Sequence, residues 1–139
     1  MTTPTTAAKG LDHVAIAVKD LEVAIKHYVE VLGFAPPEIE EVAEQQVRTA
    51  IFGHGMGRIE LICPTNPTSS VAKFLEKRGE GLHHICVEVA DIERTLADLK
   101  QKGAQLIDQT PKIGAGGAKI AFIHPKGSHG VLTELRQGK

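Results

Sequence analysis

The sequence lacks tryptophan and has only one tyrosine and four phenylalanines among 139 residues. Proteins that bind single-stranded nucleic acid stack its bases on aromatic side chains, so this composition argues against nucleic acid as a ligand. An excess of charge of either sign is also missing, because 16 lysines and arginines face 17 aspartates and glutamates, for a net charge of −1. This balance argues against a broad nucleic-acid surface and a basic membrane anchor.

Long hydrophobic runs and cysteine pairs are scarce as well. No window approaches the 18 apolar residues that a membrane span needs. Cys63 and Cys86 form neither a disulfide framework nor a Cys-x-x-Cys metal clip, which favours a reducing compartment. Residues 1–9 have the features of neither a signal peptide nor an arginine-rich transit peptide. We therefore expect a flexible N-terminus over residues 1–9, one domain over residues 10–139, and a cytoplasmic location (the mitochondrial matrix in a eukaryote).

Histidine and glycine are plentiful by contrast, with seven and fourteen residues, and an internal repeat organises them. Residues 11–26 (LDHVAIAVKDLEVAIK) align with residues 82–97 (LHHICVEVADIERTLA) at a constant offset of 71. The copies end alike, in Ile-Glu-Leu at residues 59–61 and Thr-Glu-Leu at residues 133–135. The chain therefore consists of two related halves, about residues 10–63 and 82–137. The identical pairs are Leu11/Leu82, His13/His84, Val18/Val89, Asp20/Asp91 and Glu22/Glu93.

Each half is predicted to contain a strand, a helix and further strands. Apolar residues at every second position indicate strands near residues 13–18 and 84–89. Asp20 and Asp91 stand where a helix N-cap is expected, and Gly33 and Gly103 where the helices end. The apolar stripes expected to face the core are Leu21, Ala24, Ile25, Tyr28, Val29 and Leu32 in the first helix, and Ile92, Leu96 and Leu99 in the second.

Hairpins and a mid-chain helix complete the predicted elements. Strands at 47–52 and 58–62 flank a glycine-rich turn, and strands at 119–123 and 131–135 flank residues 125–130. A loop at 64–70 leads into a short helix at 71–78. These elements predict an α+β fold of two tandem βαβββ modules that form a curved, cleft-like mixed sheet with helices outside.

Two histidines and two glutamates are the strongest candidates for chemistry. His13 and His84 alternate with the apolar stripes of their strands and therefore face away from the helices. Glu60 and Glu134, each flanked by residues that face the helices, lie on the same side. Imidazole and carboxylate groups in this number suit a divalent metal, whereas carboxylates converging without a cation would repel one another. A single histidine in a strand would be weak evidence for a metal site. The hypothesis rests on the recurrence of a histidine and a glutamate at matching positions in both halves.

Other residues have weaker patterns. The segment 113–117 (IGAGG) could approach a ligand closely, but it lacks the spacing of known phosphate loops, and a mobile loop is the simpler interpretation. Lys112, Lys119, Lys126 and the basic residues 73, 77 and 78 are solvated by default. Two histidines at the last hairpin are possible cleft-mouth residues, and the other three are predicted to be incidental; they are His124 and His129, and His27, His54 and His83.

Five segments resemble the methylmalonyl-CoA epimerase family of the vicinal-oxygen-chelate, or glyoxalase-like, superfamily. They are LDHVAIAV (11–18), GLHHI (81–85), KIGAGG (112–117), HPKG (124–127) and GVLTEL (130–135). The resemblance runs from about residue 10 to 137 and agrees with the repeat, because members of the superfamily pair βαβββ modules. It implies that His13, Glu60, His84 and Glu134 bind a divalent metal such as Co, Mn, Ni or Zn. It also implies a homodimer and a CoA thioester substrate, with Gly116, Gly117, Lys126 and Thr49 near that substrate.

The chemistry that the resemblance implies is a 1,1-proton transfer that interconverts (2R)- and (2S)-methylmalonyl-CoA through a metal-stabilised enolate. One acid/base on each face of the substrate moves the proton. Glu134 is the candidate for one face. Some epimerases place a glutamate at the position of Thr49 and a glutamine at that of Glu60, so we expect Glu60 to supply the opposing carboxylate here. Glu88 and Cys86 are reserve candidates, although Cys86 is better explained as a space-filling residue.

Three other functions fit the same fold. A glyoxalase I would also use two histidines and two glutamates, but the epimerase-like motifs of residues 112–135 argue against it. An extradiol dioxygenase usually needs two histidines, one glutamate and a longer chain. A non-catalytic small-molecule binder of the superfamily commonly lacks the metal ligands. Because fold-level analogy does not fix a substrate, these alternatives remain open at the level of sequence.

Overall fold

The computed structural model describes residues 8–138, which form two compact units. One unit comprises residues 13–83, and the other comprises residues 8–12 together with residues 84–138. The first strand, β1 (Ala8–Ala17), contributes to both units. The predicted flexible N-terminus lies outside the described residues over positions 1–7, and residues 8 and 9 already belong to β1.

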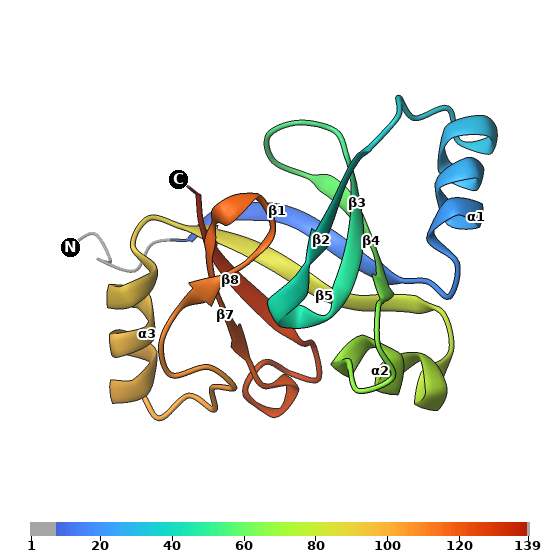
Figure 1. Cartoon of the computed structure of the whole chain (residues 1–139). Helices are drawn as coiled ribbons and strands as arrows, with labels where there is room; N and C mark the ends of the chain where they lie inside the picture. The colour runs from blue at the N-terminus through green and yellow to red at the C-terminus, as the bar shows by residue number, and fades with distance from the viewer. Residues whose placement is uncertain (1–7, 139) are drawn as a thin grey trace. The chain divides into compact units, whose positions relative to one another are not determined.

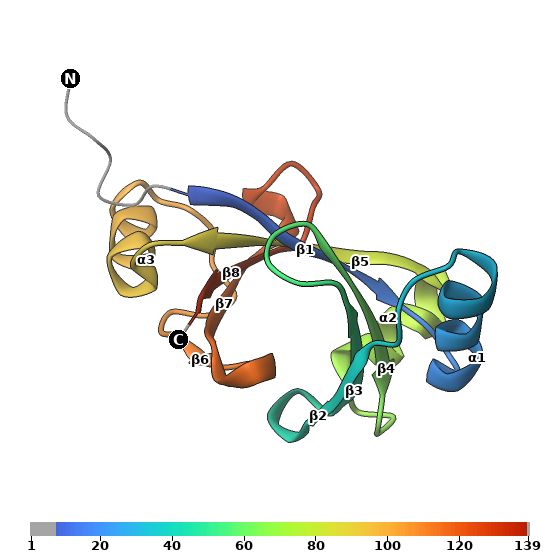
Figure 2. The ribbon, with the colours of Figure 1, turned by 90° about the horizontal axis from the view of Figure 1, so that it is seen from above.

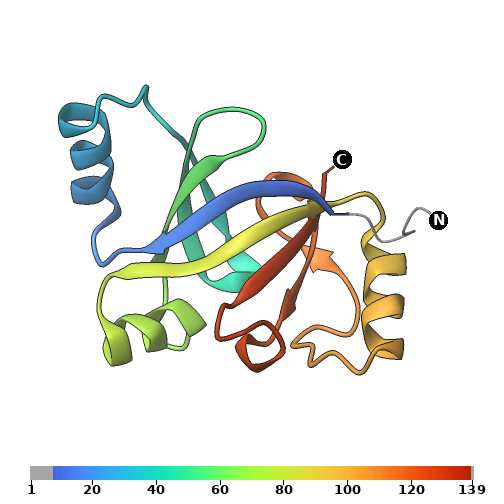
Figure 3. The same ribbon diagram turned by 180° about the vertical axis from the view of Figure 1, so that it is seen from behind.

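The unit of residues 13–83 is built on a four-stranded mixed sheet in the order β2-β3-β4-β1 (Figure 1). β1 and β4 are parallel, and the β3 pairs with β4 and with β2 are antiparallel. After β1 come α1 (Leu21–Lys26), a π-helical turn (His27–Val31), β2 (Glu38–Val42), a 3-10 turn (Ala43–Gln45), β3 (Val47–Phe52), β4 (Arg58–Pro64) and α2 (Ser70–Arg78). Figure 3 shows α2 from behind, in the connection from β4 to β5.

The core of this unit lies between α1 and its sheet. Its buried side chains are Val18, Leu21, Ala50, Phe52 and Leu61, with Ile16, Ala24, Ile25, Tyr28 and Val29 among those packed against them. The predicted cap is confirmed, because the Asp20 carboxylate accepts a hydrogen bond from the Val23 N–H.

Leu32 departs from the predicted stripe, and its side chain is 54% exposed. The turn before it is π-helical, with more residues per turn than an α-helix, so the apolar positions lose the 3.6-residue phase that the prediction assumed. Gly33 follows with a φ of +81°, the left-handed conformation expected where the helix ends.

The second unit repeats this plan, with strand order β5-β8-β7-β6. Its elements are β5 (Gly81–Val89, of which residues 81–83 belong to the first unit), α3 (Ile92–Gln101), β6 (Lys112–Ile113), a 3-10 turn (Ala115–Gly117), β7 (Lys119–Ile123), a 3-10 turn (Pro125–Gly127) and β8 (Thr133–Gln137). β5 and β8 are parallel, whereas β8 with β7 and β7 with β6 are antiparallel. Figure 2 shows α3 where the chain leaves β5.

The core of the second unit confirms the predicted face of α3. Ile92 and Leu96 are buried with Val89, Ala121 and Leu135, and the Asp91 carboxylate caps the helix by accepting from the Arg94 N–H. Each module thus contains one strand, one helix and three further strands, which confirms the predicted α+β fold of two βαβββ modules. Among the residues the structure describes, no helix combines the length and apolar character needed to cross a membrane.

The edge strand β2 was not predicted. Its sequence, Glu-Ile-Glu-Glu-Val, is largely exposed and carries three carboxylates, so it has no apolar face to reveal a strand. Charged residues on an exposed edge also discourage pairing with another chain.

Two leucines of the segment 21–32 test where the core of the first unit lies. Leu21→Ala removes a side chain that is 1% exposed, and we expect a loss of about 2–5 kcal/mol in the free energy of unfolding. Leu32→Ala is the matched control, with an expected change within about 0.5 kcal/mol, because Leu32 is solvated. Urea unfolding measures both. Equal losses in the two variants would contradict this packing.

Candidate metal and acid/base residues

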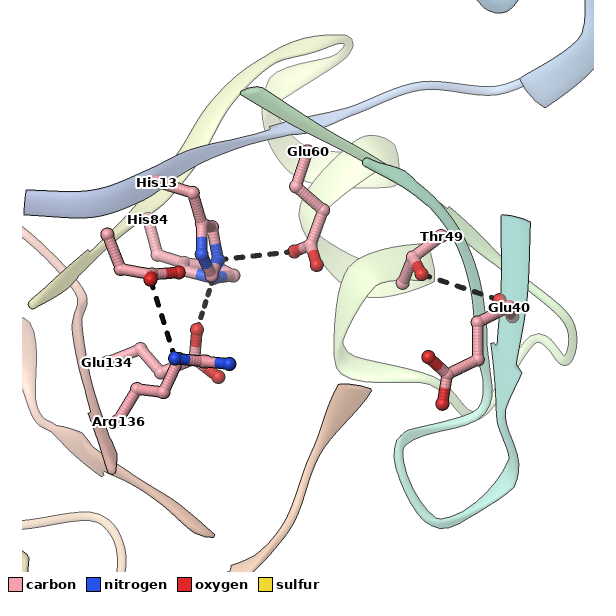
Figure 4. Close-up of polar contacts among 8 residues, drawn as sticks. His13, Glu40, Thr49, Glu60, His84, Glu134 and Arg136 are labelled. Carbon is pink, nitrogen blue, oxygen red and sulfur yellow. Dashed lines mark hydrogen bonds and ion pairs between the residues drawn. The ribbon is translucent and has the colours of Figure 1, made fainter. Parts of the chain in front are cut away.

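His13 and Glu60 lie next to each other in the first unit. His13 is on β1 and Glu60 on β4, and the parallel register places Ala15 opposite Glu60. Leu61 packs into the core behind the sheet, so Glu60 faces the other way, as its alternation predicted. The His13 Nε2 and Glu60 Oε1 atoms are 3.5 Å apart, and each side chain is only 7% exposed (Figure 4).

His84 and Glu134 form the equivalent pair of the second unit. His84 lies on β5 and Glu134 on β8, and the register places Cys86 opposite Glu134. The His84 Nε2 and Glu134 Oε1 atoms are 3.2 Å apart, with side chains 6% and 8% exposed (Figure 4). The structure therefore brings together, within each unit, the histidine and glutamate that the repeat predicted.

The donor atoms of both pairs suit a divalent cation. Imidazole nitrogen and carboxylate oxygen are common ligands of Zn, Mn, Co and Ni ions, and both pairs are almost fully removed from water. Burying a carboxylate is costly unless it is paired or bound to a cation. Apolar side chains would be less costly at these buried strand positions, so the presence of glutamate there needs an explanation. The imidazole and carboxylate of each pair could thus bind a metal ion, and the carboxylate could also accept a proton.

Thr49 lies on the same face of the sheet as Glu60. It is in β3 opposite Ile62, two residues from Ile51, which stands opposite Glu60. Its side chain is buried, and its hydroxyl donates a hydrogen bond to the backbone carbonyl of Glu40, at 3.4 Å (Figure 4). A neutral hydroxyl held in this way does not replace a carboxylate as a general base at neutral pH.

Glu88, the reserve acid/base candidate, is engaged in an ion-pair network instead. Its Oε1 atom lies 2.7 Å from Nη1 of Arg136, and its Oε2 atom accepts a hydrogen bond from the Gly138 N–H at 2.9 Å. Arg136 also lies 3.5 Å from Oδ1 of Asp12, a buried carboxylate on β1. Both oxygens of Glu88 are thus committed to structural contacts.

The charge of Arg136 is fixed by the same network. Burial alone would lower the pKa of its guanidinium, but the hydrogen bond to Glu88 and the negative charges of Asp12 and Glu88 together raise that pKa above its ordinary value. Neither Asp12 nor Arg136 was singled out from the sequence. For Arg136 the signal is in the alternation, since it follows Glu134 by two residues and pairs in register with Glu88. Alternation gives no such signal for Asp12, which is adjacent to His13 on β1.

The glycine-rich segment forms a tight 3-10 turn. Gly116 and Gly117 have φ values of +69° and +78°, which favour glycine. The Gly114 and Gly117 N–H groups donate to the carbonyls of Ala118 and Gly114, so these two donors are used within the loop itself. Lys126 is exposed in the next turn, where its backbone N–H donates to Nδ1 of His124.

The remaining histidines take separate positions. His83, expected to be incidental, packs edge-on against Phe74 of α2 with ring centroids 4.9 Å apart. His27 and His54, also expected to be incidental, are exposed. His129 is exposed in the last hairpin with a φ of +53°, and His124 caps a 3-10 turn.

Comparisons with known proteins assign the chain to a family. Residues 12–122 match the Glyoxalase/Bleomycin resistance protein/Dioxygenase superfamily. The mitochondrial methylmalonyl-CoA epimerase of Homo sapiens is 41% identical over 91% of this chain and 73% of its own. The ethylmalonyl-CoA/methylmalonyl-CoA epimerase of Cereibacter sphaeroides is 41% identical over 91% of this chain and 96% of its own. A structure of a methylmalonyl-CoA epimerase with methylmalonyl-CoA and NH4+ superposes with a TM-score of 0.91 at 37% identity, covering 95% of this chain and 96% of the other.

The chain therefore belongs to the glyoxalase-like superfamily, and it carries the two βαβββ modules expected of that fold. Within that superfamily it belongs to the methylmalonyl-CoA epimerase family. The resemblance drawn from the five sequence motifs is confirmed.

Glu88→Gln tests the structural role of the ion-pair network. We expect a loss of about 1–3 kcal/mol in the free energy of unfolding, because Arg136 and the Gly138 N–H lose a charged acceptor in a largely buried place. Glu93→Gln is the matched control. It breaks the ion pair between Glu93 and Lys119, whose side chains are 65% and 48% exposed, respectively. The free energy of unfolding should change by less than about 1 kcal/mol. A Glu88→Gln variant as stable as the parent would show that the network is not structural.

Proposed function

We propose that the protein interconverts (2R)- and (2S)-methylmalonyl-CoA by a 1,1-proton transfer. The observation that carries the proposal is the recurrence of a buried histidine–glutamate pair at equivalent positions of both modules, 3.5 Å and 3.2 Å apart. The chain that carries these pairs is about 40% identical to proteins named as methylmalonyl-CoA epimerases. A CoA thioester is accordingly the proposed substrate.

The proposed metal ligands are His13, Glu60, His84 and Glu134, acting together on one divalent ion of the Co, Mn, Ni or Zn type. Two arguments support the set. The repeat makes the pairs equivalent, and both pairs combine a neutral nitrogen donor with a carboxylate in a buried position. When bound, such an ion stabilises negative charge on substrate oxygen atoms.

Glu134 and Glu60 are the proposed acid/base groups. A general base takes the α-proton on one face, and a general acid returns a proton on the other, so two groups of matched chemistry are needed. Glu134 belongs to one module and Glu60 to the other, and both are carboxylates. Thr49 carries no carboxylate, and Glu40, which pairs with it on the edge strand β2, is exposed. Glu60 is buried, and it is therefore our candidate on this sheet.

The remaining parts of the proposal concern substrate contacts, assembly and location. We assign contacts with the substrate to Gly116, Gly117, Lys126 and Thr49. The glycine turn permits close approach, and the exposed Lys126 ammonium suits an anionic group of the substrate. A single domain over residues 10–139, a homodimer and a cytoplasmic or mitochondrial location remain predictions. The relatives include both bacterial proteins and proteins named as mitochondrial.

Deuterium incorporation tests the function directly. Purified protein with Co²⁺ and methylmalonyl-CoA in D₂O should introduce deuterium at the α-carbon, which NMR or mass spectrometry detects. Mn²⁺, Ni²⁺ and Zn²⁺ are tested in parallel, and chelation of the metal should abolish the exchange. The hemithioacetal of methylglyoxal and glutathione serves as the alternative substrate. Turnover of that compound without exchange of methylmalonyl-CoA would establish a glyoxalase I instead, and binding without turnover of either would indicate a non-catalytic binder.

Glu60→Gln separates the acid/base role of Glu60 from its ligand role. We expect the variant to keep its metal through the amide oxygen and to lose epimerisation by about 100-fold or more, the usual contribution of a general acid–base group. Glu134 should still exchange the α-proton of the epimer that faces it. Pure (2R)- and (2S)-substrates in D₂O therefore distinguish the outcomes, because only one should exchange, and without inversion. Full epimerisation with metal still bound would exclude Glu60 as the second acid/base.

A further inference from the structure

Phe122 occupies a distinctive place in the second unit. It lies on β7 directly opposite Glu134 of β8, so its side chain is on the same face of the sheet as that carboxylate. Its backbone is held as well, because the Phe122 N–H donates to Oδ2 of Asp108 at 2.8 Å. The Phe122 carbonyl accepts from the Ile107 N–H at 2.9 Å. These two hydrogen bonds fix the backbone of Phe122 and thereby restrict where its phenyl ring can lie.

The ring makes two contacts of different chemistry. It meets the imidazole of His84 at a centroid distance of 5.3 Å and an interplanar angle of 88°, an edge-to-face arrangement. The ammonium of Lys112 lies 5.3 Å from the same ring centroid, and 3.3 Å from Oδ1 of Asp108. Asp108 therefore fixes both the backbone of Phe122 and the cation above its ring.

The first module has no such ring at the equivalent position. The residue opposite Glu60 is Ile51, a side chain that offers no electrostatic preference for the orientation of an imidazole. An aromatic ring has a negative face and a positive edge, so it favours one relative orientation of a neighbouring imidazole. The two modules thus differ in what surrounds their histidine–glutamate pairs.

We propose that Phe122 is a positioning residue that sets the ring plane of His84, and that Asp108 and Lys112 link the glycine turn to this contact. The proposal rests on the proposed metal-binding role of His84. Lys112 begins the segment that leads to the turn at residues 115–117, so displacement of that segment moves the cation above Phe122. Groups that orient a ligating histidine tune its affinity for metal without touching the metal. Loop order and metal affinity are coupled in this arrangement, and the coupling is reciprocal.

The test compares four variants by Co²⁺ binding, measured by calorimetry and by the visible spectrum of the bound ion. Phe122→Leu removes the ring and should weaken Co²⁺ affinity by about 3- to 10-fold with an altered spectrum. Phe122→Tyr keeps the ring and should stay within about 2-fold of the parent. Lys112→Met should weaken affinity by about 2- to 5-fold. Lys119→Met is the matched control on the neighbouring strand, where the lysine pairs with Glu93, and should leave affinity unchanged.

A second measurement keeps this inference separate from the metal proposal. In the metal-free protein, the NMR signals of the His84 ring should show a displacement caused by the Phe122 ring current, lost in Phe122→Leu and kept in Phe122→Tyr. A parent that binds no Co²⁺ but shows this displacement would contradict the metal site and retain the positioning contact. Parental affinity and spectrum in Phe122→Leu, or a His84 signal that does not respond to loss of the ring, would overturn the role of Phe122.

Discussion

A carboxylate can be buried in a protein only beside a group that compensates for its lost hydration, and this constraint shapes both units of the fold. Glu60 and Glu134 stand on central strands of their sheets, where apolar side chains would be cheaper to bury. Each has an imidazole at contact distance. The strands, the helix caps and the apolar core behind each sheet hold these pairs in place.

The repeat duplicates the ligand pairs, but their surroundings have diverged. The second pair lies beside Phe122 and near a network in which Arg136 holds Glu88 and Asp12. The first pair has the aliphatic Ile51 opposite its glutamate. Such divergence suits a reaction in which the two faces of the substrate meet different groups. In the proposed reaction, one carboxylate takes a proton while the other returns one.

The sequence was sufficient to predict the elements that follow local rules. Alternation and N-capping aspartates located the first strand and the helix of each module, and the offset of the repeat paired His13 with Glu60 and His84 with Glu134. Local patterns could not show β2, whose residues are exposed and charged, or the exposure of Leu32 after a π-helical turn. The contacts of Glu88 and Phe122 depend on strand register, which alternation alone does not specify.

The central proposal is that both histidine–glutamate pairs bind the same ion. Native mass spectrometry and calorimetry with Co²⁺ measure this most directly, on the parent chain and on the His13→Ala and His84→Ala variants. The account predicts a single ion for each chain and a loss of at least about 100-fold in affinity when either histidine is removed, since each would supply a direct ligand. Two ions for each chain, or one variant with parental affinity, would contradict it.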